Sequence, residues 1–377
     1  MPSCDQLTFC DFINNAFSKQ GVYIVAEIIR SAKPLVKFEC LEYSLNMENR
    51  RTEGRNSAHR EMNARRIKTA ALSAVLFFAL SCGALQVIRA AGPATAPQAE
   101  AALIRPEKIT FPSSDGDAAG GKPTPVDGYL YRPEGKGPFP AIVALHGCSG
   151  LLAKSGKVSA RFADWAQRLT ALGYVVLFPD SFTPRRISGV CSQADRSGFS
   201  ARKERAGDAN GALLYLQSRS FVHPDLIALL GWSHGGSTLL AAIDASSNRE
   251  AGKDFRTAIA FYPGCTGFQK NINWLPRVPL TILIGEEDDW TPAASCRSLV
   301  ERSRRAGRDA DIVVFPHAYH AFDHPDLPLR TRKGLAFTVR KDGTATIGTN
   351  PEARAAAIEL VPKILRRHLQ EKGTQGN

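Results

Sequence analysis

The feature that most constrains this chain is an apolar run that meets a glycine-rich turn at residues 227–236. The run reads Ile-Ala-Leu-Leu-Gly-Trp-Ser-His-Gly-Gly, so Gly231, Ser233 and Gly235 form the pattern G-x-S-x-G. A strand before this pattern and a small-residue helix after it are the context in which the serine hydroxyl is exposed. The pattern therefore predicts a strand–turn–helix unit that presents Ser233 as a nucleophile. A serine in an ordinary turn is the alternative.

Short apolar runs alternate with amphipathic stretches from residue 106 onward, which is typical of βα units around a sheet. We expect buried strands at 141–146, 174–179, 227–232, 257–262, 280–285 and 311–315. Helical spacing is found at 158–172, 201–217, 237–245, 293–306 and 351–369. Segment 108–132 is expected to supply one or two leading antiparallel strands. The predicted fold class is α/β, with a mostly parallel central sheet and helices on both faces.

A serine hydroxyl is a weak nucleophile near neutral pH, so Ser233 needs a base and a carboxylate that holds the base in one tautomer. The loop after run 280–285 holds four adjacent carboxylates, from Glu286 to Asp289. Loops at the carboxyl ends of parallel strands are where functional side chains gather. This loop is therefore expected to supply the acid, with Asp288 as the candidate and Asp289 as its main rival.

Three histidines follow the last expected strand, which ends at residue 315. They are His317, His320 and His324, and the second stands in the segment Tyr-His-Ala-Phe. We expect His320 to be the general base, while either of the others could be a surface histidine. The chain order is then serine, carboxylate, histidine.

Acyl transfer also needs two backbone N–H groups that face the developing oxyanion, one of them on the residue after the nucleophile. That residue is His234. The second donor is expected from the loop His-Gly-Cys-Ser-Gly at 146–150, and we favour the N–H of Cys148. The imidazoles of His146 and His234 are expected to be structural, and no cluster with metal-ligand spacing is evident.

Four segments together resemble the dienelactone hydrolase family of α/β hydrolases. They are 146–150, 231–236, 285–288 and 319–322, and the resemblance covers about residues 105–370. It implies the α/β-hydrolase fold, and the spacing G-x-x-D-x-x-x-P that is familiar from these hydrolases selects Asp288. It also implies transfer of an acyl group to the nucleophile and its hydrolysis, with small carboxylic esters or lactones as substrates and no cofactor. Founding members carry cysteine where this chain has Ser233, as many esterase-like relatives do.

Two other functions compete with an esterase. A serine peptidase could use the same residues on the same fold, although the sequence shows no domain that would gate peptides. A cell-envelope binding protein could keep the fold without catalysis, which the intact set of candidate catalytic residues argues against. Labelling by a fluorophosphonate would separate enzyme from binding protein, and ester against amide substrates would separate esterase from peptidase.

The N-terminal region contains an export segment. An uncharged, largely apolar stretch at 69–88 follows Arg65, Arg66 and Lys68 and precedes small residues, which is the layout of a signal peptide. We expect cleavage near residues 90–91, with 62–91 as signal peptide and 92–105 as a flexible linker to the catalytic domain at 106–377. Residues 1–61 have no assignable motif, which favours a start at Met62. An uncleaved membrane anchor at 69–88 is the alternative to export into the periplasm or medium.

Four cysteines follow the export segment, an even number in a chain expected to reach an oxidising compartment. In the fold that the resemblance implies, the strand ending at 146 neighbours the strand ending at 179, and the strand ending at 262 neighbours the one ending at 285. We therefore predict the disulfides Cys148–Cys191 and Cys265–Cys296. Free buried thiols are the alternative, because connectivity cannot be read from sequence.

The charge pattern gives no support for nucleic-acid binding. The formal net charge is +12, yet the chain has no run of five basic residues and no zinc-finger spacing. We expect a solvated basic surface and a small-molecule substrate as the partner. The sequence does not indicate an oligomeric state.

Overall fold

The computed structural model describes residues 103–114, 121–192, 200, 203–247 and 253–370. The chain divides after Gln98, and all described residues fall in the part that begins at Ala99. The expected segments 1–61 and 62–91, and residues 92–102 of the expected linker, lie outside the described residues. Within those ranges we find no helix with the length and apolar character needed to span a bilayer.

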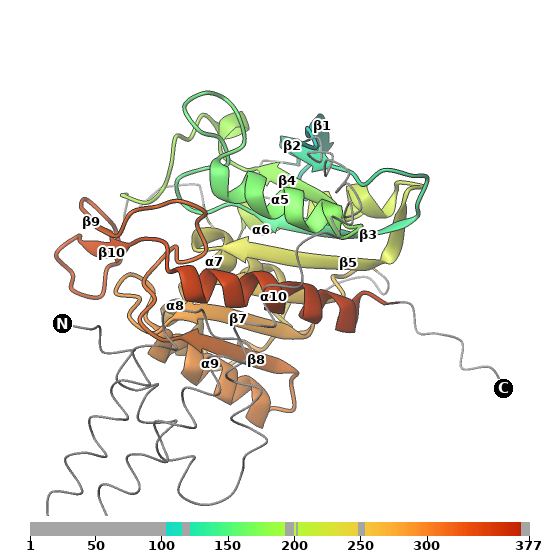
Figure 1. Cartoon of the computed structure of the whole chain (residues 1–377). Helices are drawn as coiled ribbons and strands as arrows, with labels where there is room; N and C mark the ends of the chain where they lie inside the picture. Colours follow the sequence, from blue (N-terminus) through green and yellow to red (C-terminus); the bar gives the residue numbers. More distant parts are fainter. Residues whose placement is uncertain (1–102, 115–120, 193–199, 201–202, 248–252, 371–377) are drawn as a thin grey trace, which may run out of the picture. The chain divides into compact units, whose positions relative to one another are not determined.

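An eight-stranded sheet forms the centre of the molecule (Figure 1), in the order β1-β2-β4-β3-β5-β6-β7-β8. The strands are β1 (Glu107–Pro112), β2 (Pro125–Tyr131), β3 (Phe139–Leu145), β4 (Val175–Asp180), β5 (Val222–Trp232), β6 (Thr257–Phe261), β7 (Leu280–Gly285) and β8 (Ala310–Phe315). β2 pairs antiparallel with β1 and β4, whereas all neighbours from β4 to β8 are parallel. The predicted fold class is confirmed, with the antiparallel strands at one edge.

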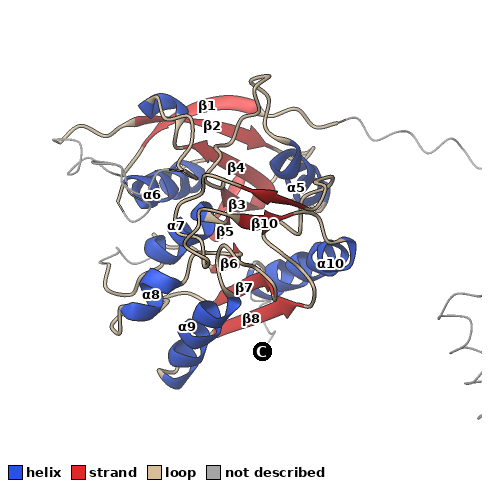
Figure 2. Ribbon diagram, turned by 90° about the vertical axis from the view of Figure 1, so that its left-hand side faces the viewer, coloured by secondary structure: helices blue, strands red, loops and turns tan. Residues whose placement is uncertain are grey.

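Helices cover both faces of the sheet (Figure 2). α5 and α10 lie on one face, and α6, α7, α8 and α9 lie on the other. Their bounds are α5 (Ala160–Ala171), α6 (Glu204–Gln217), α7 (His234–Ala242), α8 (Thr266–Lys270), α9 (Ala293–Arg305) and α10 (Pro351–His368), with one 3-10 turn, η1 (Thr183–Arg185). In α5 the buried residues Phe162, Trp165, Ala166 and Leu169 recur at helical spacing, so one stripe faces the sheet.

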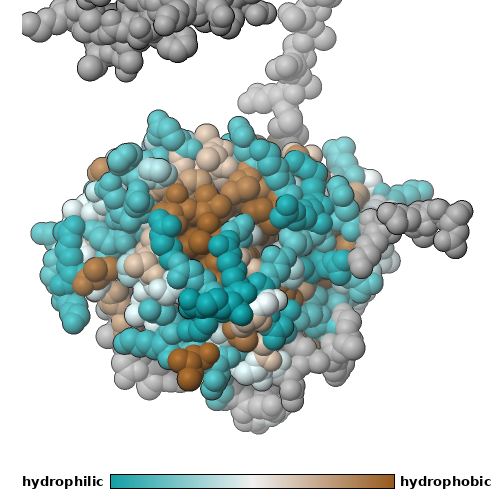
Figure 3. All heavy atoms as spheres, turned by 90° about the horizontal axis from the view of Figure 1, so that it is seen from below, coloured by the Kyte–Doolittle hydropathy of each residue, from teal (hydrophilic) through white to brown (hydrophobic). Residues whose placement is uncertain are grey.

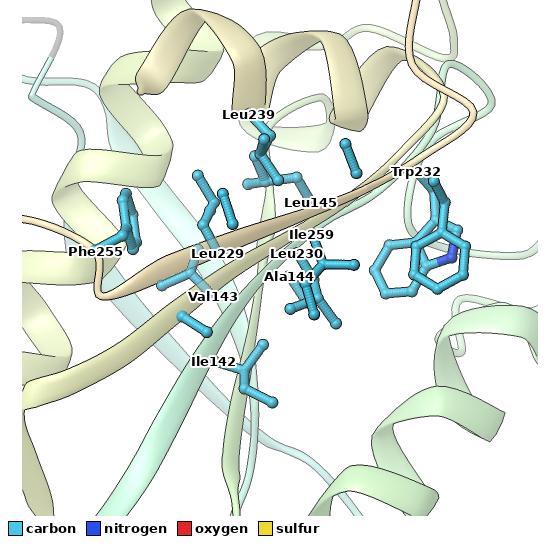
Figure 4. Packing of buried hydrophobic residues seen from close by; sticks show 14 of the residues in the cluster. Ile142, Val143, Ala144, Leu145, Leu229, Leu230, Trp232, Leu239, Phe255 and Ile259 are labelled. Carbon is cyan, nitrogen blue, oxygen red and sulfur yellow. The ribbon is translucent and has the colours of Figure 1, made fainter. Parts of the chain in front are cut away.

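The central parallel strands are buried on both faces, which explains why their sequences are continuously apolar. Every residue of β6 and the last five of β3 are buried. Figure 4 shows side chains of β3 and β5 packing together with Leu239 of α7 and Ile259 of β6. The core therefore lies directly behind the strand ends that carry the candidate catalytic residues.

The structure differs from the sequence-based expectations in a few places. α7 begins at His234, three residues before the expected start, because the turn at Ser233 needs only one residue between β5 and the helix. β5 begins at Val222 and is longer than expected. A small antiparallel hairpin of β9 (Arg330–Arg332) and β10 (Ala345–Ile347) was not expected at all.

β8 forms the open edge of the parallel part of the sheet. Three of its residues, Ile312, Val313 and Val314, are only partly buried. Figure 3 looks onto the molecule from this lower side and shows apolar side chains gathered between polar ones.

Candidate active site

The turn between β5 and α7 holds Ser233 in a strained backbone conformation, with φ of 55° and ψ of −115°. Such values are rare for a residue with a side chain and persist only where the surroundings impose them. Here the imposing contacts are close: a Cβ on Gly231 would lie 2.4 Å from the Gly235 carbonyl oxygen, and a Cβ on Gly235 would lie 2.1 Å from that of Leu145. Both glycines of the motif are therefore required by the approach of strand and helix.

The structure brings Ser233, His320 and Asp288 together from three separate loops. The Nε2 of His320 lies 3.0 Å from the Oγ of Ser233, and its Nδ1 lies 2.8 Å from Oδ2 of Asp288. All three side chains are buried. The rings of Tyr262 and Trp290 pack against the imidazole, with centroids at 4.5 and 4.8 Å. These contacts fix the orientation of the imidazole.

The loop after β7 holds Asp288 firmly in this position. Its Oδ1 accepts hydrogen bonds from the backbone N–H groups of Trp290 and Thr291, at 3.0 and 2.7 Å. Its Oδ2 accepts one from the Thr291 hydroxyl at 2.9 Å, in addition to the contact with His320. Three fixed donors thus leave one oxygen aimed at the imidazole.

The rival residues named from the sequence lie elsewhere. Asp289 accepts hydrogen bonds from Thr346, outside the triad contacts. His317 has an 86% exposed side chain and pairs with Glu287 at 3.2 Å. His324 accepts a hydrogen bond from the Asp326 backbone, and burial lowers its pKa. The contacts printed for these three residues include none with Ser233.

The loop after β3 carries the other expected oxyanion donor, Cys148. The Cys148–Cys191 disulfide has formed, with an S–S distance of 2.05 Å, and the Val190 N–H donates to the Cys148 carbonyl at 2.8 Å. The second predicted disulfide, Cys265–Cys296, has formed as well. The first disulfide therefore holds the loop that would carry an oxyanion donor.

His146 has the structural position that we expected. Its Nε2 accepts the N–H of Ser181 at 3.4 Å, so Nδ1 carries the proton and donates to the Gly147 carbonyl at 2.8 Å. Burial, with Arg205 nearby, holds its pKa well below the usual value. The imidazole is therefore neutral and braces the loop.

Sequence reasoning missed Arg205, a fully buried residue of α6 behind the expected oxyanion hole. Its guanidinium donates to the His146 carbonyl at 2.8 Å and to Nδ1 of His234 at 2.7 Å. A guanidinium only donates, so Nδ1 of His234 must be unprotonated. Burial lowers the pKa of Arg205 to about 9, which leaves it charged at neutral pH. This cation joins the two loops that carry the candidate donors.

Sequence reasoning also missed Asp323, which is fully buried three residues after His320. It accepts hydrogen bonds from the indole N–H groups of Trp165 and Trp232, each at 2.8 Å, and from the Tyr262 hydroxyl at 2.5 Å. Burial raises the pKa of Tyr262 well above its usual value, so the phenol keeps its proton and donates. Asp323 thereby ties strand ends together behind the imidazole. Its place after the histidine was the only available signal.

Ser233 opens onto a cavity of about 820 Å³. Its apolar lining comprises the Cys148–Cys191 disulfide, Val190, Trp290, Pro292, Ala336, Phe337 and Val339. Its polar lining includes Ser237, Thr266, Thr291, Ser295, Thr338 and Lys341. Among the described ranges no group of three histidine, cysteine or acidic side chains is placed to hold a metal ion. The cavity can therefore hold a mainly apolar ligand beside a hydrogen-bonded Ser–His–Asp set.

Residues 126–369 match the model of the dienelactone hydrolase family. The chain belongs to this family. The match covers most of the described structure, including every candidate catalytic residue. The chain is therefore a hydrolase of the dienelactone hydrolase family, as its sequence motifs predicted.

Relatives within this range share modest sequence identity. A Bradyrhizobium protein named "Probable 2-oxo-3-(5-oxofuran-2-ylidene)propanoate lactonase" is 22% identical over 208 residues, which cover 52% of this chain and 77% of that protein. The solved structure of Thermogutta terrifontis esterase 2 phosphoramylated by tabun is 17% identical, covers 72% of this chain and 98% of that one, and has a TM-score of 0.49. A dienelactone hydrolase-like promiscuous phosphotriesterase from metagenomic libraries is 20% identical, covers 71% and 100%, and has the same TM-score.

Proposed function

We propose that this member of the dienelactone hydrolase family cleaves a carboxylic ester or lactone through an acyl-enzyme intermediate on Ser233. The observation that carries the proposal is the hydrogen-bond chain from Ser233 through His320 to Asp288, at 3.0 and 2.8 Å, beside a largely apolar cavity. This arrangement supplies a nucleophile, a base and an orienting acid without further groups.

In the first half-reaction the Oγ of Ser233 attacks the ester carbonyl while Nε2 of His320 takes its proton. Asp288 accepts the Nδ1–H hydrogen bond and stabilises the imidazolium that forms. The negative charge on the carbonyl oxygen falls to the backbone N–H groups of Cys148 and His234. The latter begins α7, whose N-terminal N–H groups and dipole favour an anion.

The tetrahedral intermediate then collapses, and the C–O bond to the alcohol breaks as His320 returns the proton to the leaving oxygen. Water enters next, gives its proton to Nε2 and attacks the acyl carbon. Breakdown of the second intermediate releases the acid and restores the hydroxyl of Ser233. A lactone follows the same course, with the alcohol still attached to the acyl group.

The test is hydrolysis of short-chain p-nitrophenyl esters by the full chain under non-reducing conditions, compared with Ser233→Ala. We expect kcat to fall by at least about 1,000-fold in the variant. A fluorophosphonate should label the wild type and not the variant. Wild-type labelling without ester hydrolysis, together with cleavage of matched amides, would point to a peptidase. No labelling and no turnover would contradict the proposal and favour a binding protein.

We further propose that the protein is exported. Two disulfides join described cysteines, and such bonds persist in oxidising compartments. Expression of the full chain in a Gram-negative host, followed by osmotic shock and N-terminal sequencing, should yield a periplasmic chain that begins near residue 91. An intact N-terminus in the membrane fraction would favour an anchor instead, and recovery in the cytosol would contradict export.

A further inference from the structure

Part of the cavity wall comes from an excursion of the chain between His320 and α10. Residues 327–349, here called the strap, contain the β9–β10 hairpin and leave the main sheet. Figure 1 shows this hairpin on the side of the molecule toward which β5 points, where the candidate catalytic loops lie. The strap contributes Ala336, Phe337, Thr338, Val339 and Lys341 to the cavity lining.

Asp289 anchors the strap. Its Oδ1 accepts the backbone N–H of Thr346 at 2.7 Å, and its Oδ2 accepts the Thr346 hydroxyl at 3.1 Å and a guanidinium N–H of Arg340 at 3.0 Å. Its backbone carbonyl also accepts the N–H of Val339 at 3.1 Å. One aspartate, next in sequence to Asp288, thus holds both arms of the strap.

Two further contacts join the strap to the candidate catalytic loops. The indole N–H of Trp290 donates to the Ala336 carbonyl at 3.0 Å, and the Ala336 N–H donates to the Cys191 carbonyl at 2.9 Å. Arg332 donates to the hydroxyl of Ser149 at 3.2 Å, in the loop after β3. The position of the strap is therefore set by the same loops that hold the oxyanion donor and the acid.

The strap presents apolar side chains that folding does not require. Phe337 is 79% exposed and Val339 is 50% exposed, yet both line the cavity. Phe337 also has φ of 60°, which is an outlier for a bulky residue. A strained, exposed aromatic residue at a cavity mouth costs free energy, and such residues cluster at ligand sites. The cost is offset if a ligand covers the ring.

The two walls of the cavity differ in chemistry. Phe337 and Val339 continue an apolar wall that includes Trp290, Val190 and the Cys148–Cys191 disulfide. Hydroxyl groups of Ser237, Thr266 and Ser295 lie in the remaining lining. A volume of about 820 Å³ is far larger than an acetate ester needs and falls within the range of drug-sized ligand sites.

We propose that the strap builds an apolar subsite that selects esters with one bulky, preferably aromatic, substituent, and that Asp289 is its positioning residue. This inference rests on the proposed esterase function and deepens it. Phe337 and Val339 contact the substituent, whereas Asp289 acts through the strap. The substituent can belong to the acyl or to the alcohol part of the ester.

The kinetic test compares a bulky with a small ester on each side of the scissile bond. p-Nitrophenyl 4-phenylbutanoate is compared with p-nitrophenyl acetate, and 2-naphthyl acetate with ethyl acetate. Phe337→Ala and Val339→Ser should lower the bulky-to-small ratio of kcat/KM roughly tenfold in one of the two pairs. Leu329→Ala is the matched control, because Leu329 lies in the strap and is 62% exposed but does not line the cavity. Unchanged ratios in both pairs, or an equal fall in the control, would overturn the proposal.

A binding measurement separates failure of the subsite from failure of the esterase function. In the Ser233→Ala background, calorimetry should give a dissociation constant for the preferred bulky ester that rises roughly tenfold on adding Phe337→Ala. The same constant in both proteins would refute the subsite even if the wild type hydrolyses esters. A wild type that hydrolyses no ester refutes the proposed function, while the binding result still decides the subsite.

Asp289→Ala tests the positioning role. We expect KM for the preferred bulky ester to rise roughly tenfold while its kcat changes by less than about threefold, because the triad contacts stay intact. Glu286→Ala removes an exposed carboxylate from the same loop and serves as the control. A fall in kcat with KM unchanged would show that Asp289 acts on the chemistry and would overturn this assignment.

Discussion

At the scale of single residues, Arg205 and Asp323 have the most unusual surroundings of the site. Both are fully buried ionisable side chains, and neither contacts Ser233 in the contacts described above. Burying such groups is unfavourable unless hydrogen bonds compensate, so each marks a place where several segments must be held together. Both therefore lead to predictions at this scale.

Arg205→Met should lower kcat for p-nitrophenyl acetate roughly tenfold with little change in KM, because the side chain spans the His146 and His234 loops. Arg205→Lys should recover only part of this, since an ammonium cannot reproduce the planar guanidinium geometry. Steady-state kinetics is the measurement, with the exposed Arg219→Met as control. Wild-type kcat in Arg205→Met would show that the guanidinium does not position the oxyanion loops.

Asp323→Asn should destabilise the protein by about 3 kcal/mol, because an amide can no longer accept from Trp165, Trp232 and Tyr262 together. Urea unfolding followed by tryptophan fluorescence measures the loss. Asp326→Asn, at an exposed position three residues later, should change stability by less than about 0.5 kcal/mol. Equal stability of the two variants would argue that the buried carboxylate is not a structural hub.

At the scale of elements, the two disulfides join loops at the carboxyl ends of the parallel strands. Cys148–Cys191 ties the loop after β3 to the segment that follows β4, across 43 residues of chain. Cys265–Cys296 ties the start of α8 to α9 across 31 residues. The first contacts the candidate oxyanion loop directly and the second does not, so their loss should have different consequences.

The double variant Cys148→Ser/Cys191→Ser should lose both stability and catalysis. Loop-entropy arguments give roughly 4 kcal/mol of destabilisation for either disulfide at these separations. We expect kcat to fall about tenfold below wild type in this variant, because the Cys148 N–H loses its fixed position. Cys265→Ser/Cys296→Ser should show a comparable loss of stability with a smaller effect on kcat. Melting curves and p-nitrophenyl acetate kinetics on both variants decide this, and equal effects on kcat would contradict it.

At the scale of the whole molecule, stability should depend on pH through histidines. His146 is fully buried, and burial also lowers the pKa values of His324 and His368. These groups bind a proton in the unfolded chain near pH 6.5 but not in the folded chain. The unfolded state therefore binds more protons below this pH, and stability falls as the pH falls.

The free energy of unfolding should fall between pH 6.5 and 5 by up to about 1.4 kcal/mol per pH unit for His146 alone. Urea titrations at several pH values measure this slope. The variant His324→Gln/His368→Gln should keep most of it, because His146 has the most complete burial of the three. A flat profile in the wild type over this range would show that the His146 site accepts a proton after all.

Much of the fold and part of the site could be predicted because they depend on local patterns. The elbow at Ser233 follows from glycines at fixed offsets, and the buried strands follow from apolar runs whose two faces are both covered. The strand neighbours of this fold predicted both cysteine pairs, which the structure forms. Neighbouring residues in the chain carry all of this information except the strand order.

What only the tertiary structure decided are the contacts between distant segments. Asp288 and Asp289 are adjacent, yet one faces His320 and the other holds the strap at Thr346. Likewise, Arg205 and Asp323 gain their partners from loops and strands far away in sequence. The side-chain direction changes from one residue to the next, so a pattern can nominate a group of candidates but cannot choose among them. The choice depends on which partner lies within hydrogen-bond distance once the sheet has assembled.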